Sequence, residues 1–131
     1  MVQTTGQIGE THYKTVITNG RHELVADEPK ANGGTDLGFS PTELLCSALA
    51  ACTCATLRMY ADRKKWNVTE VKVYIRFTGN PEKNISNITR EIEMTGNLST
   101  EQRERLLDVA NHCPIHKILS RPIAIESSLM A

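Results

Sequence analysis

Apolar and polar residues alternate strictly between residues 68 and 79, which predicts a strand with one buried face. A second alternating run covers residues 85–98, and the stretch NPEKN between the two runs indicates a turn. We therefore expect two neighbouring strands. The apolar face of the first carries Val71, Val73, Ile75 and Phe77, and one face of the second carries Ile88, Arg90, Ile92 and Met94.

The N-terminal third has the pattern of a β-hairpin. The β-formers at 11–18 and 21–26 flank an Asn19-Gly20 pair, which is a strong signal for a tight turn between two strands. A glycine-rich stretch, NGGTDLGFSP, follows at 32–41 and predicts a loop.

A long helix is predicted from Pro41 to about Lys65. Ser40 is a good N-cap, Pro41 fits the first helical position, and Glu43 completes a capping box. The helix is apolar nearly all round until it becomes charged at ADRKK. It falls short of the roughly 18 uninterrupted apolar residues of a membrane span, so we expect a helix buried on all sides in a core or dimer.

Two helices and a strand are predicted after the second alternating run. Ser99 and Gln102 form a second capping box, and the helix that follows should extend to about Asn111. PIHKIL at 114–119 indicates a short helix, and RPIAIESSL at 121–129 a final strand. The whole chain, residues 1–131, is expected to form a single α+β domain.

Charge and composition limit the binding partners and the cellular compartment that we expect for the protein. Fifteen basic residues balance fifteen acidic ones, and no basic stripe is present, so nucleic acid is not an expected partner. The N-terminus lacks the charged and apolar regions of a secretion signal, so we expect a cytoplasmic protein without a membrane anchor. In that compartment four cysteines indicate thiols rather than a disulfide framework.

The cysteines within the long helix cannot work as a local pair. Successive helical residues differ by about 100°, so Cys52 and Cys54 point to opposite sides, and Cys46 lies more than two turns from Cys54. If one of these thiols is reactive, its partner must therefore come from elsewhere in the chain, and the remaining cysteine is Cys113. We expect Cys113 at the start of the short helix, where the helix end and the flanking His112 and His116 favour a thiolate.

The sequence alone allows other interpretations of these residues. Each helix cysteine can be a small buried hydrophobe with no chemistry. His112, Cys113 and His116, with Cys52, could hold a zinc ion, although their spacing is uncommon for zinc and we expect no metal or cofactor. The serine-hydrolase motif G-x-S-x-G and the phosphate-loop motif G-K-[ST] do not occur.

Two stretches resemble the OsmC/Ohr superfamily, in its OsmC-like branch of redox proteins. They are GGTDLGFSPTELLCSALAACTCATLRMYADRKKW (33–66) and CPIHKILSRPIAIES (113–127), and the order of elements between them also agrees. The resemblance implies an intertwined homodimer in which long central helices pack against antiparallel sheets. It places the reactive sites at the subunit interface.

The same resemblance implies a thiol-dependent peroxidase. Cys52 would be the peroxidatic cysteine and form a sulfenic acid, Cys113 would resolve it as a disulfide, and an external dithiol would reduce the disulfide. The apolar helix favours organic hydroperoxides as substrates.

Two positions depart from the pattern of the organic-hydroperoxide members. In those members a Glu directly follows the Pro of the SPTE motif and pairs with an N-terminal Arg, whereas here Thr42 holds that position and Glu43 comes one residue later. Arg21 is the early arginine candidate, and it does not match by position. Glu43, Arg21 and His116 are therefore candidates for activating or supporting roles. The alternative function is a non-catalytic module that binds a small apolar ligand in the dimer cleft.

Overall fold

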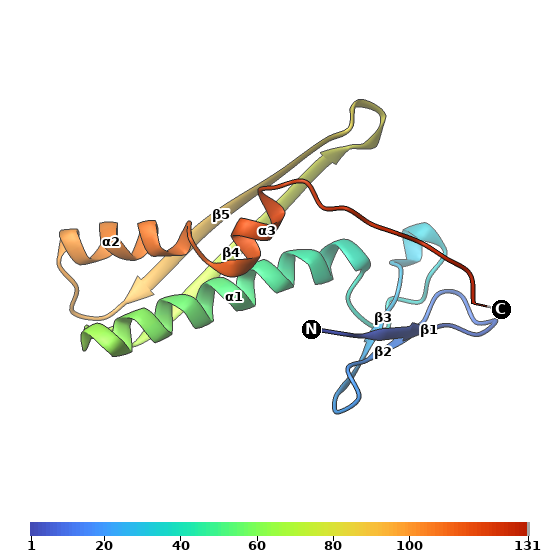
Figure 1. Cartoon of the computed structure of the whole chain (residues 1–131), viewed down its shortest axis with the longest axis horizontal. Helices are drawn as coiled ribbons and strands as arrows, with labels where there is room; N and C mark the ends of the chain where they lie inside the picture. Colours follow the sequence, from blue (N-terminus) through green and yellow to red (C-terminus); the bar gives the residue numbers. More distant parts are fainter. Residues whose placement is uncertain (131) are drawn as a thin grey trace. The chain divides into compact units, whose positions relative to one another are not determined.

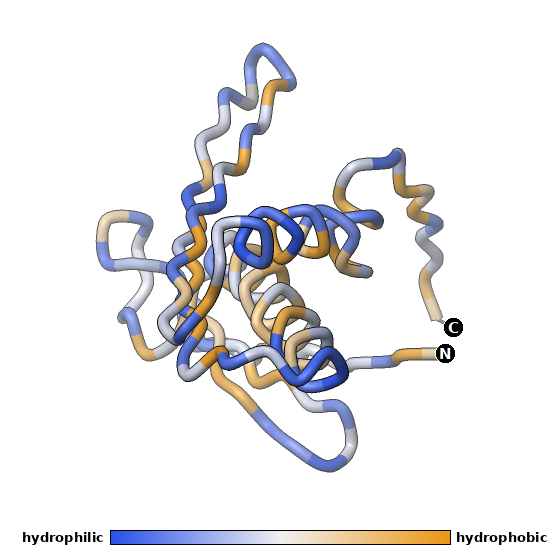
Figure 2. Tube along the Cα trace, turned by 90° about the vertical axis from the view of Figure 1, so that its left-hand side faces the viewer, coloured by the Kyte–Doolittle hydropathy of each residue, from blue (hydrophilic) through white to orange (hydrophobic). Residues whose placement is uncertain are grey.

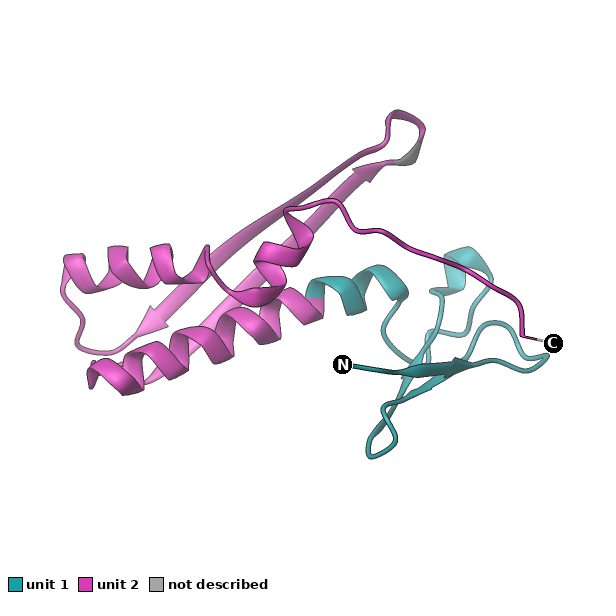
Figure 3. Ribbon diagram, in the orientation of Figure 1, with its two compact units in different colours: residues 1–46 teal, residues 47–131 magenta. Residues whose placement is uncertain are grey.

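The structure is a computed structural model that describes residues 1–130, apart from the side chain of Pro81. It divides into two compact units, the first ending at Cys46 and the second beginning at Ser47 (Figure 3). Helix α1 (Pro41–Lys64) is continuous across the boundary (Figure 1). The α+β composition agrees with the predicted fold class, while the single domain stays a prediction.

The first unit contains a three-stranded antiparallel sheet with the order β1-β2-β3. Its strands are β1 (Thr5–Gln7), β2 (Thr15–Thr18) and β3 (Glu23–Ala26), followed by a short 3-10 helix, Lys30–Asn32. The predicted hairpin is confirmed, because the backbone N–H of Asn19 donates to the His22 carbonyl at 3.2 Å and Gly20 has a φ of 93°. Strand β1 was not predicted, since three residues are too few to show a pattern.

A buried carboxylate organises the loop between β3 and α1. The side chain of Asp27, only 2% exposed, accepts hydrogen bonds from the Thr35 hydroxyl at 2.7 Å and from three backbone N–H groups. Those donors are Glu28, Leu37 and Tyr13, at 2.7, 3.1 and 3.2 Å. Because the Thr35 hydroxyl and these N–H groups stabilise the charged form more than burial opposes it, the pKa of Asp27 falls to about 2.

Helix α1 begins with the predicted capping box. The Ser40 N–H donates to Glu43 Oε1 at 2.9 Å, and the Glu43 N–H donates to Ser40 Oγ at 3.2 Å. These bonds to Ser40 lower the pKa of Glu43. The helix ends at Lys64, one residue before the predicted end, and Lys65 has a φ of 59°.

Within the single chain α1 is buried on one side only, so its burial on all sides in a dimer stays a prediction. Its buried residues form one stripe at four-residue spacing, Leu49, Thr53, Leu57 and Ala61. The opposite stripe, Ala51, Ala55 and Met59, is exposed, because the second unit covers one side of the helix only. By length and composition α1 could cross a membrane, and core helices of soluble proteins share these properties.

The second unit pairs two long strands with the helices. Strands β4 (Glu70–Asn80) and β5 (Ile85–Thr95) form an antiparallel hairpin through a 3-10 turn, Pro81–Lys83. Both predicted strands are confirmed, and their alternating hydropathy is visible in Figure 2. Helices α2 (Thr100–Ala110) and α3 (Pro114–Leu119) follow. The buried core lies between α1, the segment leading into β4, and α2. It consists of Leu57, Ala61, Val68, Leu106 and Ala110.

The C-terminal part is predicted correctly up to residue 119. Ser99 caps α2 and shares a capping box with Gln102, and α3 has the predicted bounds. The predicted strand at 121–129 is wrong, because within the described residues this stretch pairs with no strand and so lacks the ladder that defines one. Ile125 and Leu129 on it are highly exposed, at 85% and 100%.

We predict that Asp27→Asn lowers the melting temperature at pH 7, because an amide cannot accept all four hydrogen bonds as strongly as a carboxylate. The folded-state pKa of Asp27 lies below its ordinary value, so its contribution to stability is present above about pH 4 and is lost as the pH falls toward 2. Thermal unfolding of both proteins between pH 7 and pH 2.5 checks this. The Asn variant should show a flatter decline at the acid end.

The matched control is Asp36→Asn, in the same loop and exposed to solvent. Asn tolerates the positive φ of 54° at this position as Asp does. If the two variants had the same melting temperature at pH 7, Asp27 would not be the anchor of the loop.

Candidate functional site

Cys113 lies where the sequence predicts it, at the N-cap of α3. Its backbone is extended, with φ −66° and ψ 148°, and its side chain accepts a hydrogen bond from the backbone N–H of His116, with the nitrogen 3.4 Å from Sγ. Pro114 occupies the first helical position and fixes this geometry. The side chain of Cys113 is completely buried.

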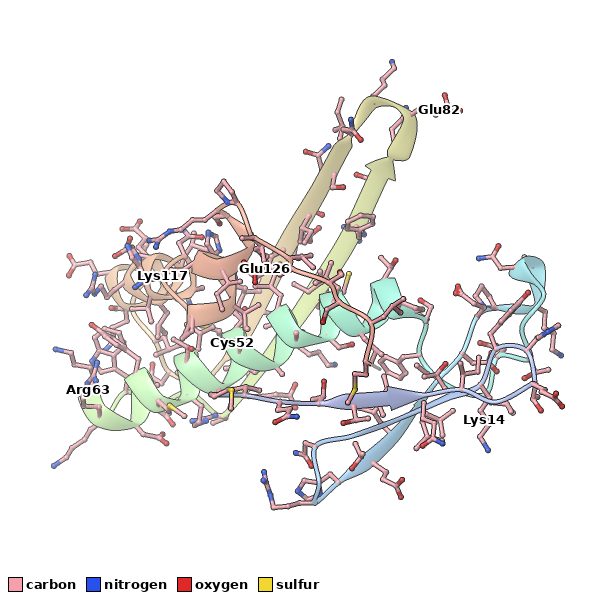
Figure 4. All side chains as sticks on the ribbon, turned by 45° about the vertical axis from the view of Figure 1, so that its right-hand side comes forward. Lys14, Cys52, Arg63, Glu82, Lys117 and Glu126 are labelled. Atoms are coloured by element: carbon pink, nitrogen blue, oxygen red, sulfur yellow. The ribbon has the colours of Figure 1, made fainter. Side chains whose placement is uncertain are left out.

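The fold brings Cys52 to Cys113. Cys52 lies near the middle of α1 (Figure 4), is half-buried, and its thiol is one of the groups that lower the pKa of Cys113. The hydroxyl of the next residue, Thr53, lies 4.0 Å from the Cys113 sulfur. Thr53 belongs to the buried stripe of α1, so the packing of that stripe sets the position of Cys52 beside Cys113.

The surroundings of Cys113 favour its ionised form. Burial raises the pKa of the thiol, but four stabilising interactions together outweigh it, so the pKa lies below the ordinary value. They are the His116 N–H, the Cys52 thiol, the Thr53 hydroxyl and the positive charge of Arg90. Cys54, on the other side of α1, has no such compensation, and burial raises the pKa of its thiol.

Arg90 is a site residue that the sequence analysis did not identify. It lies on β5, and its guanidinium donates from Nη1 to the Thr53 hydroxyl at 3.1 Å and from Nη2 to Asn111 Oδ1 at 3.0 Å. The signal was present in the sequence, because Arg90 interrupts an otherwise apolar inward face between Ile88 and Ile92.

His116, a predicted supporting residue, contacts the same guanidinium. Its Nδ1 lies 3.0 Å from Arg90 Nη2. Burial, followed by the positive charge of Arg90 and that of a protonated His112, lowers the pKa of His116. The two histidines that flank Cys113 therefore differ in environment, since His112 is exposed and its Nδ1 faces the Asp108 carbonyl at 2.8 Å.

The other two candidates belong to the first compact unit. Glu43 forms the capping box with Ser40 described above. Arg21 is exposed in the turn between β2 and β3, and its backbone N–H donates to Asn19 Oδ1 at 2.9 Å. An activating role for either residue stays a prediction.

The zinc alternative has no ligand cluster in the part of the chain that the structure describes. Over residues 1–130, no three His, Cys, Asp or Glu side chains converge as metal ligands. Near Cys113 and Cys52, the neighbouring groups are instead hydrogen-bond donors and a guanidinium.

Several solved structures share this fold. An OsmC-like protein from Mycoplasma pneumoniae matches with a TM-score of 0.78 and 23% identity, over 92% of this chain and 87% of that chain. An organic hydroperoxide resistance protein OsmC from Legionella pneumophila matches with a TM-score of 0.69 and 22% identity, over 91% and 88% of the two chains. The organic hydroperoxide resistance protein OhrB of Bacillus subtilis matches with a TM-score of 0.60 and 21% identity, over 90% of this chain and 89% of that chain.

A comparison with curated proteins found no significant match to the sequence. A family model described as OsmC-like protein matches residues 33–128, which include α1, the β4–β5 hairpin and both cysteines of the site. With the shared fold and this match over most of its length, the chain belongs to the OsmC-like protein family.

Proposed function

We propose that this protein is a thiol-dependent peroxidase that reduces organic hydroperoxides with the Cys52–Cys113 pair. The observation that carries the proposal is the proximity of the two cysteines, which come from distant parts of the chain: the hydroxyl of Thr53, the residue after Cys52, lies 4.0 Å from the Cys113 sulfur, and the Cys52 thiol helps to lower the pKa of Cys113. A pair of this kind can pass from two thiols to a disulfide without a metal or organic cofactor.

The reaction begins with Cys52, since Cys113 is completely buried and Cys52 is the partly accessible thiol of the pair. The Cys52 sulfur attacks the terminal oxygen of the hydroperoxide, forming an S–O bond and breaking the O–O bond. The alkoxide leaves as an alcohol after it takes up a proton, and Cys52 becomes a sulfenic acid. Cys113 then attacks the Cys52 sulfur, water leaves, and a disulfide forms.

An external dithiol closes the cycle by thiol–disulfide exchange. It transfers two electrons to the Cys52–Cys113 disulfide, becomes a disulfide itself, and regenerates both thiols. The net reaction converts one hydroperoxide and one dithiol into an alcohol, water and a disulfide. We place this cycle in the cytoplasm, where dithiol reductants are available.

An organic substrate is supported by the apolar character of α1 around Cys52. Ala51 precedes Cys52, and Ala48 and Ala55 lie one turn before and after it on the same side of the helix, where they offer an alkyl or aryl group a nonpolar surface. Two of the fold neighbours are named organic hydroperoxide resistance proteins, which is consistent with this substrate class.

We also propose that the protein is a homodimer. The exposed stripe of Ala51, Ala55 and Met59 lies opposite the buried stripe of α1, and Met59 is 70% exposed. A long apolar helix with one uncovered side is the surface that a second copy of the chain would cover. The central helices of the OsmC-like fold implied by the sequence are buried in this way.

We predict that the Cys52→Ser variant consumes cumene hydroperoxide, in the presence of dithiothreitol, no faster than a sample without protein. The Cys113→Ser variant should consume it more slowly than the wild type, because dithiothreitol must then resolve the sulfenic acid in place of Cys113. Cys54→Ser is the matched control and should keep the wild-type rate, since Cys54 faces the other side of α1. Equal rates in all four proteins would contradict the proposal.

Mass spectrometry distinguishes a peroxidase from a module that only binds an apolar ligand. Cys52 lies on tryptic peptide 31–58 and Cys113 on peptide 106–117. One equivalent of cumene hydroperoxide should link these two peptides through a disulfide. Unmodified thiols after that treatment would support the binding module and overturn the peroxidase.

We predict that Ala55→Glu produces a monomer, because a charge in the centre of the exposed stripe cannot be buried against a second copy. Sedimentation equilibrium of the wild type should give twice the chain mass. Thr89→Glu adds the same charge on the outward face of β5 and should leave the dimer intact. A wild-type protein that sediments as a monomer at micromolar concentration would exclude the homodimer.

A further inference from the structure

Arg90 occupies a position where an apolar residue is expected. In the β4–β5 register it lies opposite Ile75, in the same inward row as the Val73–Ile92 and Val71–Met94 pairs. An arginine on a half-buried face loses hydration unless its donors find partners. The proposed thiol chemistry does not by itself explain why the residue is there.

The guanidinium of Arg90 is held by three separate segments. Nη1 donates to Thr53 Oγ1 on α1, while Nη2 contacts Asn111 Oδ1 after α2 and His116 Nδ1 on α3. The three distances are 3.1, 3.0 and 3.0 Å. These contacts fix the position of the positive charge relative to the thiol pair.

The contact with His116 defines the protonation state of its ring. A guanidinium has donors and no acceptor, so His116 Nδ1 must accept the hydrogen bond. His116 is therefore neutral, with its hydrogen on Nε2. A protonated ring would place two donors 3.0 Å apart and displace the Arg90 side chain.

The contact with Thr53 connects Arg90 to the sulfur of Cys113. The Thr53 hydroxyl has one hydrogen, and two acceptors compete for it, the Leu49 carbonyl at 2.7 Å and the Cys113 sulfur at 4.0 Å. While Cys113 is a thiol, the hydroxyl donates to Leu49. When Cys113 is a thiolate, the hydroxyl can turn toward the sulfur, and the bond from Arg90 polarises it as a donor.

We propose that Arg90 is the positioning residue of the thiol pair, which holds the Thr53 hydroxyl as a donor to Cys113 and keeps one negative charge on the Cys52–Cys113 pair. The assignment rests on the proposed function and explains how the pair is activated without a matching N-terminal arginine. Arg90 acts as a fixed charge rather than as a substrate clamp, since Thr53, Asn111 and His116 occupy three of its donors.

The titratable groups that face the pair come from four segments. Cys52 is on α1, Arg90 on β5 and His116 on α3, and His112, after α2, acts on His116. Acidification has two effects on this set. It protonates the thiolate directly, and it charges His116, which then repels Arg90 from the position that stabilises the thiolate.

The test measures thiol ionisation without any hydroperoxide. In a Cys46→Ser, Cys54→Ser background, the rate at which iodoacetamide alkylates Cys52, the accessible thiol of the pair, is followed on peptide 31–58 from pH 5 to pH 10. We expect Arg90→Met to raise the midpoint of thiolate formation in the pair by about one pH unit or more. At a pH below the midpoint, the thiolate population and the alkylation rate then fall roughly tenfold.

Two further variants distinguish the effect of the positive charge of Arg90 from the effect of its hydrogen bonds. Arg90→Lys retains a positive charge but not the fork that reaches three partners, so its midpoint should lie between those of the wild type and Arg90→Met. Thr53→Val removes the hydroxyl and leaves the shape, so it should raise the midpoint even though Arg90 is present. Arg76→Met is the matched control, because Arg76 lies on the outward face of the same hairpin, paired with Glu91 at 2.7 Å, and it should leave the midpoint unchanged.

Nitrogen-15 NMR of the wild type provides a second readout that does not depend on a destabilised variant. We expect His116 at pH 7 to be neutral, with its hydrogen on Nε2. A hydrogen on Nδ1, or a midpoint in Arg90→Met and Thr53→Val equal to that of the wild type, would overturn the assignment. Peroxide consumption is measured separately, so a shifted midpoint without turnover would refute the peroxidase and leave the role of Arg90 standing.

Discussion

The buried stripe of α1 is the constraint on which the rest of the second unit depends. Leu57 and Ala61 lie in the core with Leu106 and Ala110 of α2, and this contact fixes the rotation of α1 about its own axis. Thr53 continues the stripe one turn earlier, so its hydroxyl must point inward. Cys52 is one residue away, about 100° around the helix, which leaves it at the edge of the buried side.

The thiol pair shows how a buried site can still favour a charge. Removing Cys113 from water opposes ionisation, and in an apolar pocket this effect would leave an inert thiol. Cys54 illustrates that outcome on the same helix, because burial alone acts on it. Cys113 differs because it has a backbone N–H at the start of α3 and a guanidinium from β5 nearby. Local hydrogen bonds, rather than exposure, therefore distinguish the two cysteines.

Much of this arrangement could be predicted because local rules determine it. The capping boxes at Ser40 and Ser99, the hairpin around Asn19 and the N-cap position of Cys113 each depend on residues within four positions of one another. The proximity of Cys52 and Cys113 depends instead on residues that lie far apart in the sequence. The sequence showed only that a reactive helix cysteine would need a distant partner and that Cys113 is the remaining cysteine; the pairing of Cys52 with Cys113 came from the resemblance to a family.

The parts that could not be predicted depend on contacts between distant segments. The alternation along β5 placed Arg90 on the inward face, but its partners on α1, after α2 and on α3 are set by packing that the pattern does not contain. The stretch at 121–129 has the composition of a strand and finds no strand to pair with in the described chain. Whether α1 is covered all round likewise depends on contacts outside the single chain, so the sequence pattern alone could not settle it.

The three contacts of Arg90 also limit how the residues around it can be substituted. Because the same guanidinium ties together α1, the end of α2 and α3, the residues around it cannot drift independently during evolution. A neutral side chain at position 90 would leave the amide of Asn111 and the ring of His116 without their shared donor. Related chains that lack this arginine should therefore differ at several of the contacting positions together, so that an inherited change at one strand position becomes visible as a coordinated change in three helical segments.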